Sequence, residues 1–170
     1  VIGQQDPDDP DHASGSGDLA QRVLMQSGCP VLVVPYAGRF DHVPQNVVLA
    51  WDGSRAAPVA IRSALPALRR ARQATVLSYA EGAADEDDRL MTAPLLQYLR
   101  RHGLHVSAHP EVTDIGVGDA LLSRLSRLSD LGADLLVMGC YGHSRWRELL
   151  LGGTTRRILR SMTVPVLMAH

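Results

Sequence analysis

The sequence predicts an α/β domain built on a parallel sheet with helices on both faces. From Asn46 onward, short runs that are apolar throughout alternate with amphipathic stretches, in the order βαβαβαβαβ. Continuous apolar strands are typical of parallel strands buried on both faces, and their alternation with helices is typical of doubly wound folds. Ligands bind in such folds beyond the carboxyl ends of the strands, where the strand order reverses.

The composition fits one packed domain and argues against several classes of partner. The chain has 170 residues, of which 45% are apolar, and a formal net charge of −1, unlike a general nucleic-acid binder. No apolar run approaches the roughly 18 residues of a membrane span, and no signal-peptide pattern is visible. Cys29 and Cys140 make neither a disulfide framework nor a metal quartet, and the seven histidines lack ligand spacing. We therefore expect a cytoplasmic protein without a metal site, a membrane partner or a nucleic-acid partner.

Apolar periodicity and turn residues give the boundaries of individual elements. Strands are expected at 30–35, 46–51, 74–80, 104–108, 135–138 and 164–169. Helices are expected after Gly153 and at 19–26, 57–68, 90–102 and 119–131. Gly28 and Gly132 are expected to stop two of these helices, and Pro66 to kink another. The acidic segment 81–89 is expected to be a solvated connection.

A repeat organises the N-terminal part of the chain. The first three residues, VIG, followed by PVLVV at 30–34, match VMG followed by PVLMA at 165–169. Residues 1–40 are therefore predicted to be the last loop, helix and strand of a first unit plus a linker, and residues 41–170 a complete second unit. The first copy has Asp6 in place of the second glycine of the motif, and its loop is acidic. Because negative charge repels phosphate, we interpret this first copy as a degenerate site.

A glycine-rich segment follows the fourth strand of the complete unit. Gly139 ends the strand, Gly142 comes after two residues, and Gly152–Gly153 after nine more, before Thr154 and Thr155. Glycines let backbone N–H groups approach a ligand closely, and a helix N-terminus favours negative charge. The segment is therefore interpreted as a phosphate cradle, with turns and a helix cap as the plainer alternative.

Residues 46–170 resemble a universal stress protein domain. The resemblance rests on VVLAWDGS at 47–54, on the G-x2-G-x9-G spacing from Gly139 to Gly152, and on the PVLMAH ending. It implies a five-stranded parallel sheet of order 3-2-1-4-5, the adenine nucleotide alpha hydrolase-like fold. It also implies either a branch that binds ATP or a branch that binds no nucleotide. The whole chain resembles the C-terminal part of a tandem form.

The resemblance also assigns an ATP site. Asp52 matches the acidic residue near adenine and ribose, Gly139 and Gly142 would hold the loop around the sugar and phosphates, and residues from Gly152 onward would donate N–H groups. The strand order would bring Asp52 and Gly139 together at the switch point. The expected set for ATP, with Mg²⁺ as an accompanying ion, is Ala50, Trp51, Asp52, Met138, Gly139, Gly142, His143, Gly152, Gly153, Thr154 and Thr155.

One departure from the nucleotide-binding pattern is expected to weaken binding. The pattern has Ser or Thr directly after the third glycine, where this chain has Gly153. A hydrogen bond to a charged group contributes about 1.5–3 kcal/mol, so its loss would lower affinity roughly tenfold to a hundredfold. Thr154 would compensate if the helix started one residue later.

Several of these residues have a plainer interpretation. Asp52 can be a turn residue with Ser54 as the helix cap. Cys140 is either a reactive thiol, if a helix dipole lowers its pKa, or a small loop residue. His143 either reaches the phosphates or lies in a solvated loop. A charged helix face is the expected role of Arg156, Arg157 and Arg160.

No catalytic constellation is visible, since GxxxxGK[ST], GxSxG and SGGxDS-like loops are missing from the sequence. The expected function is ATP binding that acts in a stress response through partner contacts. The alternatives are an interaction module of the branch that needs no nucleotide and, less favoured, a weak ATPase. Because the family dimerises through its last strands, we expect a homodimer or an intramolecular pseudo-dimer through Val31–Val34 and Val166–Met168.

Overall fold

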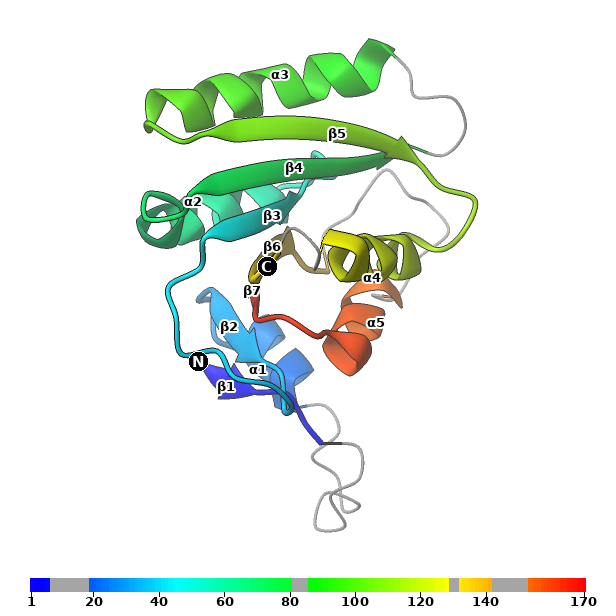
Figure 1. Cartoon of the computed structure of the whole chain (residues 1–170). Helices are drawn as coiled ribbons and strands as arrows, with labels where there is room; N and C mark the ends of the chain where they lie inside the picture. Colours follow the sequence, from blue (N-terminus) through cyan, green and yellow to red (C-terminus); the bar gives the residue numbers. More distant parts are fainter. Residues whose placement is uncertain (7–18, 81–85, 129–131, 142–152) are drawn as a thin grey trace.

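The computed structural model describes residues 1–6, 19–80, 86–128, 132–141 and 153–170, which form one sheet with helices on both faces (Figure 1). The sheet has seven strands in the order β1-β2-β7-β6-β3-β4-β5. The strands are β1 (Ile2–Gly3), β2 (Val31–Val34), β3 (Asn46–Ala50), β4 (Gln73–Ala80), β5 (Val106–Val112), β6 (Leu135–Gly139) and β7 (Val166–Ala169).

The strands from β3 onward form the predicted doubly wound sheet. β3 pairs in parallel with both β4 and β6, β4 pairs with β5, and β6 pairs with β7. Numbered within this unit, the strand order is 3-2-1-4-5, which confirms the prediction. β1 and β2 extend the sheet to seven strands, because β2 pairs antiparallel with β7 and β1 pairs in parallel with β2.

Helices cover both faces of this sheet, and a buried apolar cluster lies between the sheet and the helices on each face. α2 and α3 pack on one face, where Ile61 and Leu99 are fully buried. α1, α4 and α5 pack on the other, where Leu121 and Ile158 are buried. Successive strand residues point to opposite faces, so Val48 belongs to the second cluster and Leu49 to the first. The helices are α1 (Leu19–Gln26), α2 (Ala56–Leu68), α3 (Glu86–Arg101), α4 (Val117–Leu128) and α5 (Gly153–Ser161).

The largest differences from the predicted element boundaries are in α3 and β5. α3 begins at Glu86 rather than Leu90, so the end of the acidic segment 81–89 is helical. Acidic residues are favourable in the first turn of a helix, where they meet the positive end of its dipole. β5 spans Val106–Val112 rather than 104–108, because it pairs along β4 from Ala74 to Ala80. Its Pro110 is tolerated because β5 lies at the edge of the sheet.

Gly28 follows α1 as predicted, with φ +61°, the left-handed conformation that glycine adopts without a steric penalty. Gly132 has φ +68°, but residues 129–131 between α4 and Gly132 lie outside the described part of the chain. Pro66 lies in the last turn of α2, which continues to Leu68. In the described parts of the chain, no helix is both long enough and apolar enough to cross a bilayer, and no cluster of metal-ligating side chains occurs.

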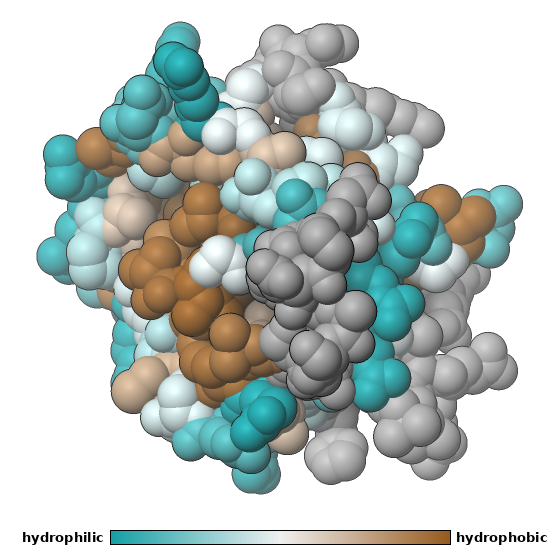
Figure 2. Space-filling model, turned by 90° about the horizontal axis from the view of Figure 1, so that it is seen from below, coloured by the Kyte–Doolittle hydropathy of each residue, from teal (hydrophilic) through white to brown (hydrophobic). Residues whose placement is uncertain are grey.

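The N-terminal strands join the rest of the molecule through the pairing of β2 with β7. Val31 lies opposite Met168, Leu32 opposite Leu167, and Val33 opposite Val166. This register confirms the intramolecular form of the predicted strand pairing. β1, β2 and α1 lie together at the lower end of the molecule in Figure 1, and the view from that side shows a continuous apolar area (Figure 2).

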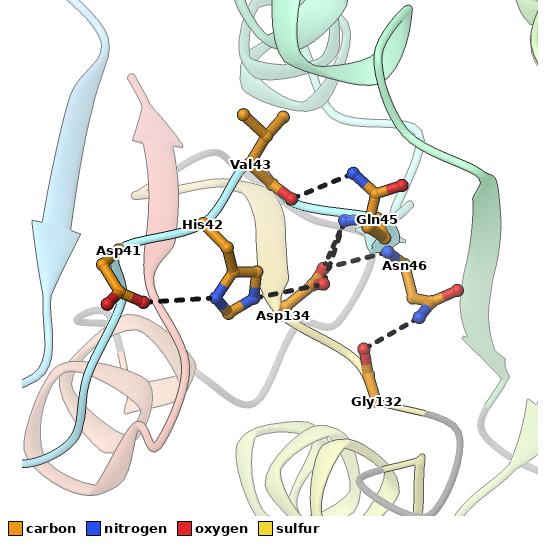
Figure 3. Close-up of polar contacts among 7 residues, drawn as sticks. All are labelled: Asp41, His42, Val43, Gln45, Asn46, Gly132 and Asp134. Atoms are coloured by element: carbon orange, nitrogen blue, oxygen red, sulfur yellow. Dashed lines mark hydrogen bonds and ion pairs between the residues drawn. The ribbon is translucent and has the colours of Figure 1, made fainter.

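The linker before β3 is fastened to the turn before β6 (Figure 3). The Asp134 carboxylate accepts hydrogen bonds from the backbone N–H of Gln45 at 2.9 Å and of Asn46 at 2.9 Å. The Asn46 side chain donates to the Gly132 carbonyl at 3.1 Å, and His42 Nε2 lies 3.6 Å from the Asp134 carboxylate. These contacts join the starts of β3 and β6, at the opposite end from the predicted site.

Candidate functional site

The predicted site lies where the strand order of the sheet reverses. β3 and β6 are parallel neighbours, and their last paired residues are Ala50 and Met138. After β3 the chain continues into α2 on one face of the sheet, whereas α5, the next described helix after β6, packs on the other face. The carboxyl ends of β3 and β6 therefore form the switch point of the fold, and Asp52 and Gly139 lie close to it.

Asp52 shapes the turn between β3 and α2. Its Oδ1 accepts a hydrogen bond from the Ser54 N–H at 2.9 Å, and Gly53 between them has φ +68°. The Ser54 hydroxyl in turn accepts the N–H of Ala57, at 3.3 Å, in the first turn of α2. The interpretation of Asp52 as a turn residue is thus confirmed, whereas the N-cap position of α2 is Arg55 and Ser54 acts from one residue before it. The second carboxylate oxygen, Oδ2, has no hydrogen-bond partner among the described residues, and Asp52 is half-buried.

Gly139 is needed because the start of α2 lies against it. A Cβ atom on Gly139 would lie 2.7 Å from the Ala57 nitrogen and 2.9 Å from the Ala56 carbonyl carbon. Contacts this short to backbone atoms leave no room for any side chain. This glycine therefore serves the packing of α2 on the end of β6, a role that the spacing of the glycines did not reveal.

Trp51 links the site to the neighbouring strand β4. Its backbone N–H donates to the Leu77 carbonyl at 2.8 Å, so this group is used by the sheet. Its indole packs against the cluster under α2 and α3. The indole Nε1 is buried and has no acceptor within the described part of the chain. Of the predicted backbone contacts to adenine, the N–H of Trp51 is therefore already engaged.

Cys140 directly follows β6 and is buried, which contradicts the interpretation as a reactive thiol and agrees with the plainer one as a small residue after the strand. Its N–H donates to the Ala169 carbonyl of β7 at 2.8 Å, and its Sγ lies 3.2 Å from the same oxygen. The residue is 1% exposed. Burial raises the pKa of the Cys140 thiol to about 12, so the thiolate is scarce at neutral pH.

Tyr141 and His170 are two residues near the switch point that the sequence did not suggest. Tyr141 follows Cys140 with φ 52°, a left-handed conformation that is uncommon outside glycine. Its ring lies 6.4 Å from the ring of His170, measured between centroids. His170 directly follows β7, so the aromatic pair stands at the carboxyl ends of β6 and β7.

The start of α5 supplies the remaining described residues of the predicted set. α5 begins at Gly153, so Thr154 is already the second helical residue and the later start that would let it compensate for Gly153 does not occur. Thr155 is 3% exposed and lies in the interior. The first N–H groups of a helix have no partner within the helix, which leaves those of Gly153–Thr155 for caps, water or a ligand.

α5 is held against α4 beside this N-terminus. The Arg157 side chain donates from Nε to the Asp119 carboxylate at 2.6 Å. A Cβ on Gly118 would lie 3.0 Å from the Arg157 Cβ, so the two helices approach closely. Arg156 and Arg160 are exposed, as expected for a charged helix face. Three residues of the predicted set, Gly142, His143 and Gly152, lie outside the described residues.

Comparison with known proteins identifies the family. A family model described as universal stress protein family matches residues 44–170, and the chain belongs to this family. A curated relative, a universal stress protein of Synechocystis sp., is 45% identical over 51 residues. That match covers 30% of this chain and 18% of the relative, so the chain matches under a fifth of the relative's length.

Solved structures of universal stress proteins share the fold. One from Archaeoglobus fulgidus is 22% identical with a TM-score of 0.67, and the match covers 90% of this chain and 54% of that chain. A universal stress protein in complex with cAMP is 23% identical with a TM-score of 0.55, covering 76% and 98% of the two chains. Another from Archaeoglobus fulgidus, in complex with dAMP, is 18% identical with a TM-score of 0.55, covering 76% and 100%.

Proposed function

We propose that this universal stress protein binds an adenine nucleotide at the switch point between β3 and β6 and acts in a stress response through contacts with partner proteins. The observation that carries the proposal is the pairing of Ala50 with Met138. This pairing sets the turn that holds Asp52 beside the end of β6, with α2 and α5 on opposite faces. Mononucleotide sites in doubly wound folds have this arrangement.

The described residues offer both kinds of group that a nucleotide needs. Oδ2 of Asp52 is an acceptor suited to ribose hydroxyls, because Oδ1 is already used in the turn to Ser54. The N–H groups at the start of α5 are donors suited to phosphate, which a helix N-terminus also favours electrostatically. Two universal stress proteins of similar fold were solved with cAMP and dAMP, which supports an adenine nucleotide as the ligand class. ATP with Mg²⁺ is the ligand that we infer.

Nucleotide binding at the start of α5 would also affect the position of α4. Because Arg157 ties α5 to Asp119 of α4, a ligand that pulls on the first turn of α5 also pulls on α4. The close approach of the two helices at Gly118 limits how far they can move relative to each other. We infer that partner proteins bind to α4 and α5 and distinguish the nucleotide-bound protein from the free protein there. The free thiols Cys29 and Cys140 agree with a reducing compartment, and the proposed location is the cytoplasm.

Calorimetric titration of the chain with ATP, AMP and cAMP, with and without Mg²⁺, tests the proposal. The pair Asp52→Ala and Asp52→Asn separates the roles of this residue. Asparagine keeps an oxygen for the Ser54 N–H but loses the charge, so a carboxylate that contacts ribose predicts roughly tenfold weaker binding for Asp52→Asn. Asp41→Ala is the control, since that side chain is 85% exposed beside His42, far from the switch point. No heat and no rise in melting temperature at millimolar nucleotide would refute the proposal.

An interaction module that needs no nucleotide is the second candidate. It is favoured by the engagement of Asp52 in its own turn and by the lack of a hydroxyl at Gly153. Under this function the chain binds its partner equally well after exhaustive dialysis and in saturating ATP. A weak ATPase is a third and less favoured function, and phosphate release that Asp52→Ala abolishes would support it.

A further inference from the structure

A basic surface lies at the amino ends of β4 and β5, at the opposite end of the sheet from the proposed nucleotide site. It is formed by two connections, one from α2 to β4 and one from α3 to β5, each of which carries a run of arginines. Because β4 and β5 pair in parallel from Ala74 and Val106 onward, these connections lie side by side, at the left of Figure 1. The arginines of the basic surface are Arg69, Arg70, Arg72, Arg100 and Arg101.

Contacts within and between the two connections hold the basic surface in one arrangement. The Arg69 guanidinium, which can only donate, lies 3.2 Å from Nδ1 of His102 and joins the ends of α2 and α3. The Tyr98 ring packs edge-on against the His102 ring, with 4.6 Å between the centroids. The Arg72 N–H donates to the Gln45 carbonyl at 2.7 Å, which fixes the backbone before β4. A ligand would therefore meet groups that are already positioned, which lowers the cost of binding.

The positive charge of the basic surface is not balanced by nearby carboxylates of the chain. All five arginines are exposed, and none of them forms an ion pair among the described residues. Residues 53–80 and 89–110, which include both connections, contain eight arginines and no Asp or Glu. The rest of the chain contains nine arginines and 18 acidic residues, which gives that part a net charge of −9. The overall net charge of −1 therefore results from two parts of opposite charge.

Helix dipoles explain only part of this arrangement. Arginines are favourable near the C-terminus of a helix, where they meet its partial negative charge, and Arg69, Arg100 and Arg101 have that position. The effect falls off within the last turn, whereas Arg72 directly precedes β4. Like charges on adjacent connections also repel one another. A cluster of this size therefore indicates an anionic ligand in addition to helix capping.

We propose that the basic surface binds a short acidic segment of a partner protein. The carboxylates of Asp and Glu match the planar fork of a guanidinium, which donates two parallel hydrogen bonds to them. The surface spans two connections only, so it suits a segment with a few closely spaced carboxylates. A long polyanion such as RNA is disfavoured, because it would also meet the part of the chain whose net charge is −9. Binding here does not depend on the proposed nucleotide site, which lies at the carboxyl ends of the strands.

Fluorescence anisotropy of a labelled peptide of alternating Glu and Ser residues, added to the whole chain without nucleotide, tests the proposal. We expect binding that weakens at least tenfold between about 50 mM and about 300 mM salt, because salt screens exposed charges. The same peptide with Gln in place of Glu should not bind. No binding of the Glu peptide, or equal binding of the two peptides, would overturn the proposal. Single-stranded RNA and vesicles that contain phosphatidylserine are compared with the Glu peptide, and tighter binding of either would also overturn it.

The double variant Arg70→Gln/Arg101→Gln removes one arginine from each connection. Both side chains are exposed, so the melting temperature should stay unchanged while the affinity for the Glu peptide falls about tenfold or more. Arg22→Gln/Arg39→Gln is the matched control, because it makes the same change in net charge on α1 and in the linker after β2, toward the other edge of the sheet. This control should bind the Glu peptide as the parent does. Equal losses of affinity in the two double variants would show that the peptide responds to net charge alone, and would overturn the proposal.

Discussion

Gly139 and Ala57 are in backbone contact, so that a Cβ atom at Gly139 would lie 2.7 Å from the Ala57 nitrogen. This contact fixes the position of α2 on the end of β6, directly beside the turn that holds Asp52. The geometry of the proposed site and the packing of the fold therefore depend on the same glycine. A substitution that moves α2 should affect both properties.

Gly139→Ala should destabilise the protein by about 1–3 kcal/mol, the usual cost of forcing extra atoms into a packed interior. Gly3→Ala is the control, because Gly3 has the same place in the repeat, neither glycine has a positive φ, and no atom of the described residues lies within 4 Å of its added Cβ. That change should stay within about 0.5 kcal/mol. Urea unfolding of both variants measures the difference. Similar losses of stability for the two would mean that the contact with α2 is not the cause.

The pairing of β2 with β7 predicts what happens when residues 1–40 are removed. Val33, Val166 and Met168 are each 0% exposed, and deletion of β2 would leave β7 as an open apolar edge. Open edges of this kind pair with other chains. We expect the shortened chain to dimerise or aggregate, as measured by size exclusion with light scattering. A stable, soluble monomer of the shortened chain would contradict this prediction.

Asp134→Ala should cost about 1–3 kcal/mol, because two backbone N–H groups, of Gln45 and Asn46, lose a charged acceptor. Asp41→Ala is the matched control. The Asp41 side chain is 85% exposed, and its ion-pair contact, to His42 Nδ1, is long at 3.8 Å. The substitution should therefore change stability by less than about 0.5 kcal/mol. Chemical unfolding of the two variants gives both values. If Asp41→Ala cost as much as Asp134→Ala, the linker would not be fastened by the hydrogen bonds in Figure 3.

The helices and strands could be predicted from the sequence because they depend on local patterns, whereas the sheet order and the β2–β7 pairing were expected only from the resemblance to universal stress proteins. Apolar runs mark buried strands, and the repeated PVL segments mark strands that are equivalent. The role of Gly139 could not be predicted in this way. Its contact with Ala56 and Ala57 joins residues that are far apart in the sequence. In the sequence, a glycine that makes room for a helix looks the same as a glycine that makes room for a phosphate.

The burial of Cys140 was missed for a related reason. β6 ends at Gly139, but the N–H of Cys140 still donates to the Ala169 carbonyl of β7, a contact with a residue far away in the sequence that no local pattern indicates. The boundary of α3 was missed because acidic residues at 86–88 were interpreted as solvated rather than as the first turn of a helix.

The two thiols should differ sharply in reactivity. Cys29 is exposed, whereas Cys140 is buried and its thiol has a pKa raised to about 12. A disulfide reagent such as DTNB should therefore label one thiol per folded chain within minutes at pH 8, and two in guanidinium chloride. The Cys29→Ser variant should show no rapid labelling when folded. Labelling of Cys140 at the rate of Cys29 would contradict its burial.

Tyr79 should make the protein less stable at alkaline pH. It lies on β4 opposite Glu111 of β5 and is 6% exposed. Burial, and then the charge of Glu111, raise the pKa of Tyr79 to about 12, while Arg124 acts in the opposite direction. Between pH 10 and pH 12 the unfolded chain therefore loses the phenolic proton while the folded chain keeps it. Stability is complete below pH 10 and falls as the pH rises toward 12, by about 2–3 kcal/mol at most.

Tyr79→Phe isolates this contribution. At pH 7 the variant should be as stable as the parent or slightly more so, because the Tyr79 hydroxyl is buried without a hydrogen-bond partner among the described residues. Both proteins should carry Cys140→Ala, since the raised pKa of that thiol adds its own loss of stability from pH 9 upward. Urea unfolding at pH 8, 9, 10 and 11 should then show a decline above pH 10 in the protein with Tyr79 and a flatter curve in Tyr79→Phe. Parallel curves for the two proteins would show that the phenol titrates alike in the folded and unfolded states.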